Sequence, residues 1–280
     1  MKTSQVNFSL FADDSKLFCS NPQFLQLAIN NVNNWLSNRQ LHLAPHKCAV
    51  LKVKKTSVVD SSSFHIDGHL VEEKSSFKDL GILVTSDLKW SKHIDRIYTN
   101  AAITSYQIFK TVKTNNIWTW MKIFKTYILP KIEFNSPIWS PHLLQDINKL
   151  ENIQKRFTRI AFHRCRLPQV TYETRLTMLD TLSLSQRRCF IDLVLMYKII
   201  NKLCHLTFDH YFVLNTSHYN LRSHSLQVRT KLQHKSPQWL HSYFTRIPSL
   251  WNKLPVLVAT APSLNTFKTQ LKIHLKQNNK

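Results

Sequence analysis

Apolar and polar residues alternate at the start of the chain, which predicts a β-hairpin. Residues 6–11 (Val-Asn-Phe-Ser-Leu-Phe) have the two-residue period of a half-buried strand, and a second apolar run follows at 16–19. Ala12-Asp13-Asp14-Ser15 separates the two runs. We therefore expect two paired strands with two adjacent aspartates at the tip.

A helix and several short strands are expected after the hairpin. Asn21-Pro22 is typical of a helix start, since asparagine caps the free N–H groups and proline fits the first helical position. Apolar residues then recur at helical spacing: Leu25, Ala28, Ile29, Val32, Trp35 and Leu36. Short strands are predicted at 49–53, 64–66 and 80–84, with Asp67-Gly68 as a turn between strands.

From Ser91 the hydrophobic period becomes helical. Helices are predicted from Ser91, from Trp118 to Leu129 with Pro130 ending the helix, from Ser140-Pro141, from a capping box at Ser183 to Gln186, and after Ser263. The expected fold class is α+β. A small β-containing region with one helix, residues 1–90, precedes a mainly α-helical remainder.

Composition excludes several classes of protein. Hydrophobic residues make up 43% of the 280 positions, which is enough for a core and argues against wholesale disorder. Two glycines cannot form a glycine-rich phosphate loop. Five cysteines without C-x-x-C spacing disfavour a disulfide framework or a zinc site. No apolar run reaches the length of a membrane span, so we expect an intracellular protein, nuclear or cytoplasmic, with no membrane partner.

Basic residues are concentrated in the later part of the chain. The net charge is +22; residues 101–280 hold 26 basic and 7 acidic residues, a net +19, against +3 for residues 1–100. Ten Lys and Arg follow Asp209, and no carboxylate does. A field of one sign favours contact with a polyanion, and RNA or DNA is the expected partner. An anionic membrane and a merely solvated basic surface are the alternatives.

Two adjacent carboxylates on a rigid hairpin suit magnesium chemistry. Mg²⁺ takes one or two protein carboxylates and leaves room for phosphates and water. Asp13 and Asp14 between two apolar strands fit that role. The alternative is an ordinary solvated turn, which is the commoner origin of such a pair.

The segment Phe11-Ala12-Asp13-Asp14 resembles the aromatic-Ala-Asp-Asp box of reverse transcriptases, and its surroundings are similar to those of non-LTR retrotransposon polymerases of the jockey kind. Later segments resemble that family in the same order: 41–48, 77–82, 88–94, 127–130, 150–156, 172–176 and 251–255. The resemblance runs from about Val6 to Leu275.

The resemblance implies a C-terminal fragment of an RNA-directed DNA polymerase. Residues 1–90 would be a partial palm, 91–165 a thumb-like helical region and 166–280 a basic helical C-terminal region. In this family the fingers and the first palm aspartate precede the box, so the isolated chain is expected to bind RNA and DNA without polymerising. An enzymatic role stays undecided.

The resemblance also assigns residue roles. Asp13 and Asp14 would bind Mg²⁺, Lys47 would act as a proton donor near the leaving pyrophosphate, and Leu80 and Gly81 would shape a primer-grip-like turn. The expected nucleic-acid contacts are Lys155, Arg156, Arg159, Arg187 and Arg188.

Two other functions are compatible with the sequence: a non-catalytic RNA- or DNA-binding module, and a transposon relic with no selected role. Trp90, Trp118, Trp120 and Trp139 are candidates for stacking on bases. Their helical spacing beside apolar residues favours core positions instead.

Overall fold

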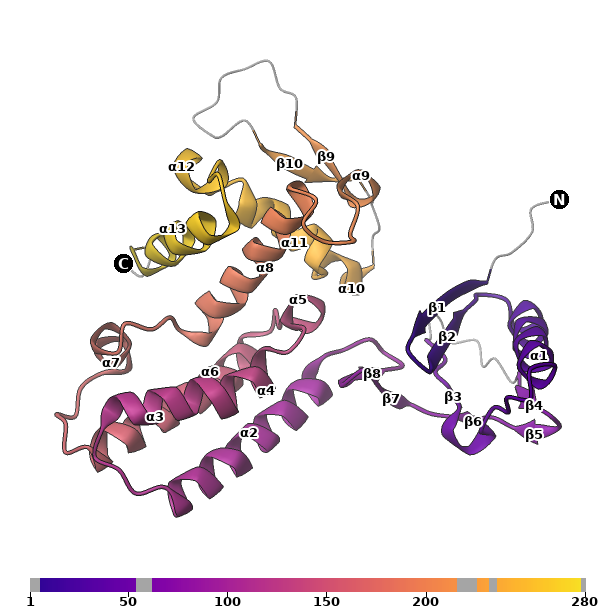
Figure 1. The fold of residues 1–280 in the computed structure, drawn as a ribbon, viewed down its shortest axis with the longest axis horizontal. Coiled ribbons are helices and arrows are strands. Elements are labelled where there is room, and N and C mark those ends of the chain that lie inside the picture. Colours follow the sequence, from indigo (N-terminus) through magenta and orange to yellow (C-terminus); the bar gives the residue numbers. More distant parts are fainter. Residues whose placement is uncertain (1–5, 54–61, 216–225, 232–235, 278–280) are drawn as a thin grey trace. The chain divides into compact units, whose positions relative to one another are not determined.

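The computed structural model describes residues 6–53, 62–215, 226–231 and 236–277 and has an α+β fold (Figure 1). The chain divides into two compact units, Met1–Lys89 and Trp90–Lys280. The first holds small two-stranded sheets and a helix, and the second is mainly helical. Residues 91–165 and 166–280 belong to the same unit.

The first unit begins with the predicted hairpin. Strands β1 (Asn7–Phe11) and β2 (Asp14–Phe18) are antiparallel, and Phe11 pairs with Asp14 across a two-residue turn. Helix α1 (Pro22–Ser37) follows, and the Asn21 side chain accepts hydrogen bonds from the first N–H groups, as predicted. The capping residue and the proline therefore locate this helix start correctly from sequence alone.

Short strands complete the first unit. They are β3 (Ala49–Val50) parallel to β6 (Glu72–Glu73), β4 (His65–Ile66) with β5 (His69–Leu70), and β7 (Ser76–Asp79) with β8 (Ile82–Thr85). A 3₁₀ turn, η1 (Pro45–Lys47), precedes β3. The core of this unit is small: Phe64, Ile66 and Val71 pack against Leu25 and Ile29 of α1. Much of the hairpin surface is left uncovered, with Leu10 and Phe11 each 63% exposed.

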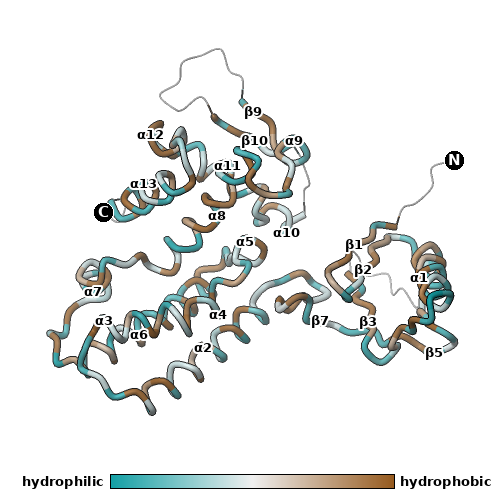
Figure 2. Tube along the Cα trace, in the orientation of Figure 1, coloured by the Kyte–Doolittle hydropathy of each residue, from teal (hydrophilic) through white to brown (hydrophobic). Residues whose placement is uncertain are grey.

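The second unit is built from amphipathic helices, which alternate between hydrophobic and hydrophilic along their length in Figure 2. Its elements are α2 (Ser91–Thr111), α3 (Ile117–Ile123), the π-helical η2 (Phe124–Ile128), α4 (Leu129–Glu133), α5 (Ser136–Trp139), α6 (Leu144–Arg164), α7 (Tyr172–Met178), α8 (Leu184–Ile200), α9 (Phe208–Tyr211), β9 (Phe212–Leu214), β10 (Val228–Thr230), α10 (Pro237–Leu240), α11 (Tyr243–Trp251), α12 (Val256–Ala259) and α13 (Leu264–Gln277). The strands β9 and β10 pair with each other.

Helix α8 joins the parts of the second unit. It packs against α6 on one side and against α11 and α13 on the other. Leu193, Met196 and Ile199 are at most 1% exposed and share a core with Trp251 and Phe267. The capping box at Ser183 and Gln186 is confirmed, with both reciprocal hydrogen bonds present. Helix α8 therefore connects the helices before it with those after it within the described part of the second unit.

The prediction that Pro130 ends the second helix is wrong. The helix runs through α3, η2 and α4 to Glu133, and Pro130 lies inside it. Proline lacks an N–H and its ring clashes with the carbonyl four residues earlier in a regular α-helix. Here the preceding turn is a π-helix, in which the Leu129 N–H donates to the Phe124 carbonyl five residues back. The wider turn accommodates the proline without ending the helix.

The π-helical turn also keeps the apolar positions on one side. Leu129 lies eleven residues after Trp118, which is roughly three turns of a regular α-helix, so an unbroken α-helix would place both on the same side. Yet Leu129 is 5% exposed and Trp118 is 60% exposed. The extra residue in the π turn rotates the second half of the helix until Ile128, Leu129 and Ile132 face the core.

The third helix starts later than its sequence indicates. Ser140-Pro141 was expected to open it, but α6 begins at Leu144. Ser140 instead ends the short helix α5, where its N–H donates to the Ser136 carbonyl.

Candidate functional site

The two aspartates lie at the tip of the first hairpin. Asp13 is in the turn, Asp14 opens β2, and both are exposed. The turn is tight because only Ala12 and Asp13 separate the strands, and Ala12 takes a left-handed φ of 51°. Short hairpin turns usually place Gly, Asn or Asp in this conformation, and alanine there costs roughly 1–2 kcal/mol. Ala12, next to the two carboxylates, therefore has a backbone conformation that alanine disfavours.

An ion pair connects this hairpin to a second one. Lys16 Nζ on β2 lies 2.5 Å from Asp79 Oδ2 on β7, although 63 residues separate them in the chain. Lys16 is two residues after Asp14, and Asp79 immediately precedes Leu80. The contact therefore brings the strand that carries Asp14 next to the strand that leads into the Leu80-Gly81 turn.

Leu80 and Gly81 form the turn that the resemblance implies, whereas the strand predicted at 80–84 begins only at Ile82. Asp79 pairs with Ile82, and both intervening residues have positive φ, 43° for Leu80 and 92° for Gly81. Two left-handed residues define the type I′ turn that matches the twist of a hairpin. Gly81 takes this conformation without steric cost, whereas Leu80 is strained and 38% exposed. Its role in holding a primer stays a prediction.

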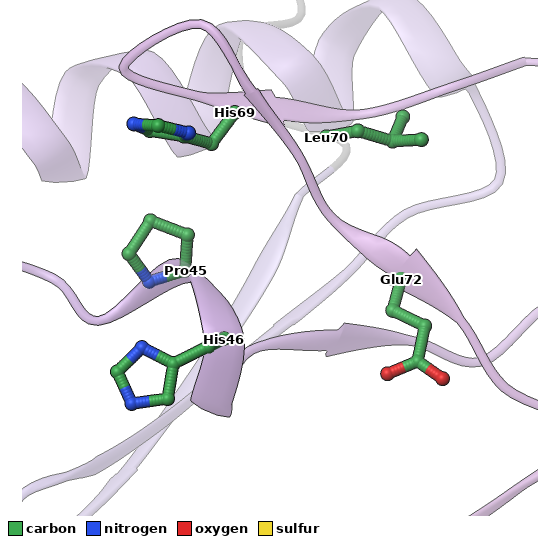
Figure 3. Close-up of a pocket in the computed structure, with 5 residues that line it drawn as sticks. All are labelled: Pro45, His46, His69, Leu70 and Glu72. Atoms are coloured by element: carbon green, nitrogen blue, oxygen red, sulfur yellow. The ribbon is translucent and has the colours of Figure 1, made fainter.

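No contact among the described residues brings Lys47 next to Asp13 or Asp14. Lys47 ends the 3₁₀ turn η1, and its side chain is exposed. The pocket next to it has a volume of about 440 Å³ and is lined by Pro45, His46, His69, Leu70 and Glu72. Figure 3 shows the rings of His69, Pro45 and His46 on one side of this pocket and Leu70 and Glu72 on the other. Neither aspartate of the hairpin tip lines it.

The donor set at the hairpin tip fits a single hydrated Mg²⁺ at most. Within residues 6–53, 62–215, 226–231 and 236–277, no three His, Cys, Asp or Glu side chains lie close enough together to hold a metal ion. One or two carboxylates can bind Mg²⁺ when water and phosphate complete its shell. A pair of bridged metals requires further carboxylates. The described residues therefore do not provide a two-metal centre.

Arg187 and Arg188 of α8, expected to contact nucleic acid, have carboxylate neighbours inside the protein. Arg187 forms a two-pronged hydrogen bond with Glu133, with Nη2 2.8 Å from Oε2. Arg188 is 4% exposed, and the charges of Glu151, Glu133 and Asp192 act on it. Burial lowers its pKa and these carboxylates raise it. Arg187 thus links α8 to Glu133 of α4, and Arg188 is buried where three carboxylate charges act on it.

The three expected contacts on α6 are more accessible. Arg156 and Arg159 are exposed on its polar side, and Lys155 is half-buried with its ammonium 5.3 Å from the centre of the Tyr172 ring. Glu151, one turn earlier, is buried instead and accepts hydrogen bonds from the Tyr172 hydroxyl and from the N–H groups of Leu184 and Ser185. Leu184 and Ser185 are the first residues of α8. The Glu151 carboxylate is favourable there because it accepts hydrogen bonds from the free N–H groups at the N-terminus of that helix.

Of the four candidate tryptophans, only Trp118 is well exposed. Trp120 and Trp139 are fully buried, as the helical spacing indicated, and Trp90 is half-buried. Trp118 is 60% exposed on the same helix as the exposed Tyr127. The sequence identifies Trp118 as a stacking candidate but not Tyr127, because the π turn Phe124–Ile128 changes the apolar period of the residues that follow Ile123.

No helix among the described residues is both long enough and apolar enough to cross a membrane. Comparison with known proteins gives one weak relative, the uncharacterized protein B0403.1 of Caenorhabditis elegans, which is 24% identical over 110 residues. That match covers 39% of this chain, and the chain spans just over half, 56%, of the relative's length. No protein-family model matches the chain. No solved structure matches it either.

Proposed function

We propose that the chain derives from the RNA-directed DNA polymerase of a non-LTR retrotransposon and binds RNA and DNA through its basic helical unit. The observation that carries the proposal is the Lys16–Asp79 ion pair, at 2.5 Å. It joins the two hairpins whose residues resemble the metal-binding box and the primer grip. A polymerase needs these two features together, since one holds the catalytic metal and the other holds the primer end.

The charge distribution supports nucleic-acid binding. Four of the eight carboxylates of the second unit form ion pairs with its own cations: Asp95 with Lys149, Glu133 with Arg187, Asp180 with Lys272 and Lys276, and Asp192 with Arg246. Residues 101–280 keep a net charge of +19 after all seven of their carboxylates are counted. A surplus of exposed cations releases counterions when it meets phosphates, and this favours binding without sequence choice.

The chain by itself is not expected to polymerise. Asp13 and Asp14 would hold one hydrated Mg²⁺, which polarises phosphate oxygens when bound, and the described residues offer no third carboxylate beside them. Transfer of a nucleotide depends on all parts of such a centre acting together, so losing one removes most of the activity. A further palm segment would have to supply the missing ligand.

A primer-extension assay on a primed RNA template, with Mg²⁺ or Mn²⁺, tests this proposal. We expect no extension by the chain alone and extension when a second polypeptide supplies the fingers and the remaining palm. That extension should disappear in Asp13→Ala and persist in Glu72→Gln, a matched exposed carboxylate of the same unit. If the chain alone extended the primer, and Asp13→Ala abolished that extension, then Asp13 and Asp14 would not need a further carboxylate from another palm segment.

The second candidate function is a non-catalytic nucleic-acid-binding module, which the incomplete donor set favours. Both candidates predict salt-dependent binding. If about six phosphates are contacted, log K should fall against log salt with a slope near −5 on duplex DNA. Binding with that slope, but no extension with any supplied palm and fingers, would favour the module. A slope of zero would contradict both.

A further inference from the structure

One segment of the second unit contains cations without any acid. Between Asp95 and Glu133 the sequence has no carboxylate, and it has six basic residues. Glu133 itself is directed to Arg187. Lys122, Lys125 and Lys131 of the helix α3–η2–α4 are all exposed, and none forms an ion pair within the described residues. The outer side of this helix is therefore positively charged along its length.

In the described part of the second unit, the exposed Trp, Tyr and Phe side chains lie in this segment or directly after it. Within the part of this unit that the structure describes, they are Tyr106, Trp118, Tyr127 and Phe134. Three of the four belong to α3–η2–α4 or follow it directly, at 60%, 57% and 54% exposure. Elsewhere in the described unit, the large exposed apolar side chains are aliphatic or methionine. Among the described residues of this unit, the exposed Trp, Tyr and Phe rings thus lie in or next to the acid-free segment.

We propose that this outer side, which we call the Trp118 face (Trp118, Lys122, Lys125, Tyr127, Lys131 and Phe134), is a stacking platform for single-stranded nucleic acid. The inference rests on the proposed function in taking nucleic acid as the partner. Unpaired bases stack on exposed aromatic rings while lysines between the rings neutralise the phosphates. Paired bases cannot stack in this way, because both of their faces are already covered inside a duplex.

The geometry of the helix suits this partner. From Trp118 to Phe134 is sixteen residues, or roughly 24 Å at about 1.5 Å per residue. Stacked nucleotides rise about 3.4 Å each, so several fit along the face. The π turn η2 carries Tyr127 and rotates the second half of the helix, so that Ile128, Leu129 and Ile132 turn inward and the exposed rings keep the outer side. Such turns are frequent at functional sites.

A membrane surface is the competing partner for a basic helix with aromatic residues. A helix that lies in a membrane buries a continuous apolar face in the lipid. In this helix the apolar side is already used by the protein core: Trp120, Met121 and Phe124 are at most 2% exposed. The side left outside has lysines between its rings. Its charge and discontinuous aromatic surface complement a polyanion with planar bases.

The test is binding of the full chain to a labelled twenty-nucleotide oligo(dT) and to a duplex of equal length, followed by fluorescence anisotropy. Stacking contributes about 1–3 kcal/mol per base, so Trp118→Ala should weaken single-strand binding about tenfold. Duplex binding should change less than twofold. Trp118→Phe should retain most of the affinity because it keeps a ring. Lys122→Gln should reduce the single-strand salt slope by about 0.7.

Controls separate stacking from general effects. Leu257→Ala removes an apolar side chain that is 78% exposed on α12, and Lys253→Gln removes an exposed cation outside the face. Leu257→Ala should leave both affinities unchanged, and Lys253→Gln should leave the preference for single strands unchanged. Urea unfolding of each variant verifies that the exposed substitutions leave the fold intact.

Three outcomes would overturn the inference. The first is equal loss of single-strand and duplex binding in Trp118→Ala, and the second is no loss at all. The third is binding to phosphatidylserine vesicles that Trp118→Ala abolishes while oligo(dT) binding stays unchanged, which would assign the face to a membrane. If wild-type protein binds both nucleic acids but the variant does so equally well, the inference fails and the proposed function stands. If wild type binds neither at low salt, both fail.

Discussion

The imidazole of His93 lies edge-on to the indole of Trp139, with ring centroids 5.2 Å apart and an angle of 62° between the planes. His93 on α2 is 3% exposed and Trp139 on α5 is fully buried, with its indole N–H donating to the Phe134 carbonyl. Burial, together with the charge of Arg96, lowers the pKa of His93 to about 4. The folded second unit therefore holds this histidine neutral between two of its helices.

Acid should destabilise the protein through His93. The pKa of His93 is about 4 when folded and near 6.5 when unfolded, so the unfolded chain binds more protons between these values. The stability that the neutral ring contributes is complete above about pH 6.5 and is lost as the pH falls to about 4, by about 3 kcal/mol. Urea unfolding at pH 7 and at pH 4.5 should show this loss in wild type and a smaller loss in His93→Phe. His163→Asn, at an exposed position on α6, should behave as wild type.

Removing the cation beside Asp192 should destabilise the second unit strongly. Asp192 is 2% exposed, and Arg246 contacts both of its oxygens at 3.0 and 3.2 Å. Burial raises the pKa of Asp192, and Arg246 lowers it. Arg246→Gln would leave the buried carboxylate without this partner, at a cost of about 3–5 kcal/mol in urea unfolding. The exposed Arg229→Gln should cost almost nothing, and adding Asp192→Asn to Arg246→Gln should recover part of the loss.

The π turn should tolerate a deletion that a regular helix does not. Removing the exposed Thr126 from η2, together with Pro130→Ala, would leave a continuous α-helix whose apolar side stays in phase. We expect it to fold with a loss of no more than about 2 kcal/mol in urea unfolding. Deleting the exposed Asn152 from α6 would turn every later residue by about 100° and move Phe157 out of the core. This control should unfold. If the two deletions lowered the free energy of unfolding equally, the π turn would not be what turns Ile128, Leu129 and Ile132 toward the core.

The candidate nucleic-acid contacts should separate into two groups. Arg156 and Arg159 are exposed on α6, so Arg156→Gln and Arg159→Gln should each reduce the duplex salt slope by about 0.9 without loss of stability, if each contacts one phosphate. Arg187→Gln breaks the pair with Glu133 and should lower stability instead. Measuring the salt slope and urea unfolding on the same variants distinguishes these roles. If Arg187→Gln reduced the salt slope and left stability to urea unchanged, Arg187 would be a nucleic-acid contact after all.

Much of the local structure could be predicted from neighbouring residues. Asn21-Pro22 and the Ser183–Gln186 box locate helix starts because capping involves groups within a few positions of each other. Asp67-Gly68 forms a turn for a similar reason, since both residues tolerate positive φ. The two aspartates at a hairpin tip and the concentration of basic charge after residue 100 also follow from the sequence alone.

Tertiary packing decided the remainder, because burial depends on contacts between residues far apart in the chain. Arg156 and Arg188 are both arginines on amphipathic helices, yet one is exposed and the other is 4% exposed among carboxylates from other elements. Lys16 meets Asp79 only because two hairpins pack in one unit. Trp118 is exposed and Leu129 is buried because a π turn, which allows Pro130 to remain within the helix, shifts the phase between them. Local pattern predicts the period of a helix, and only its packing decides which side is left outside.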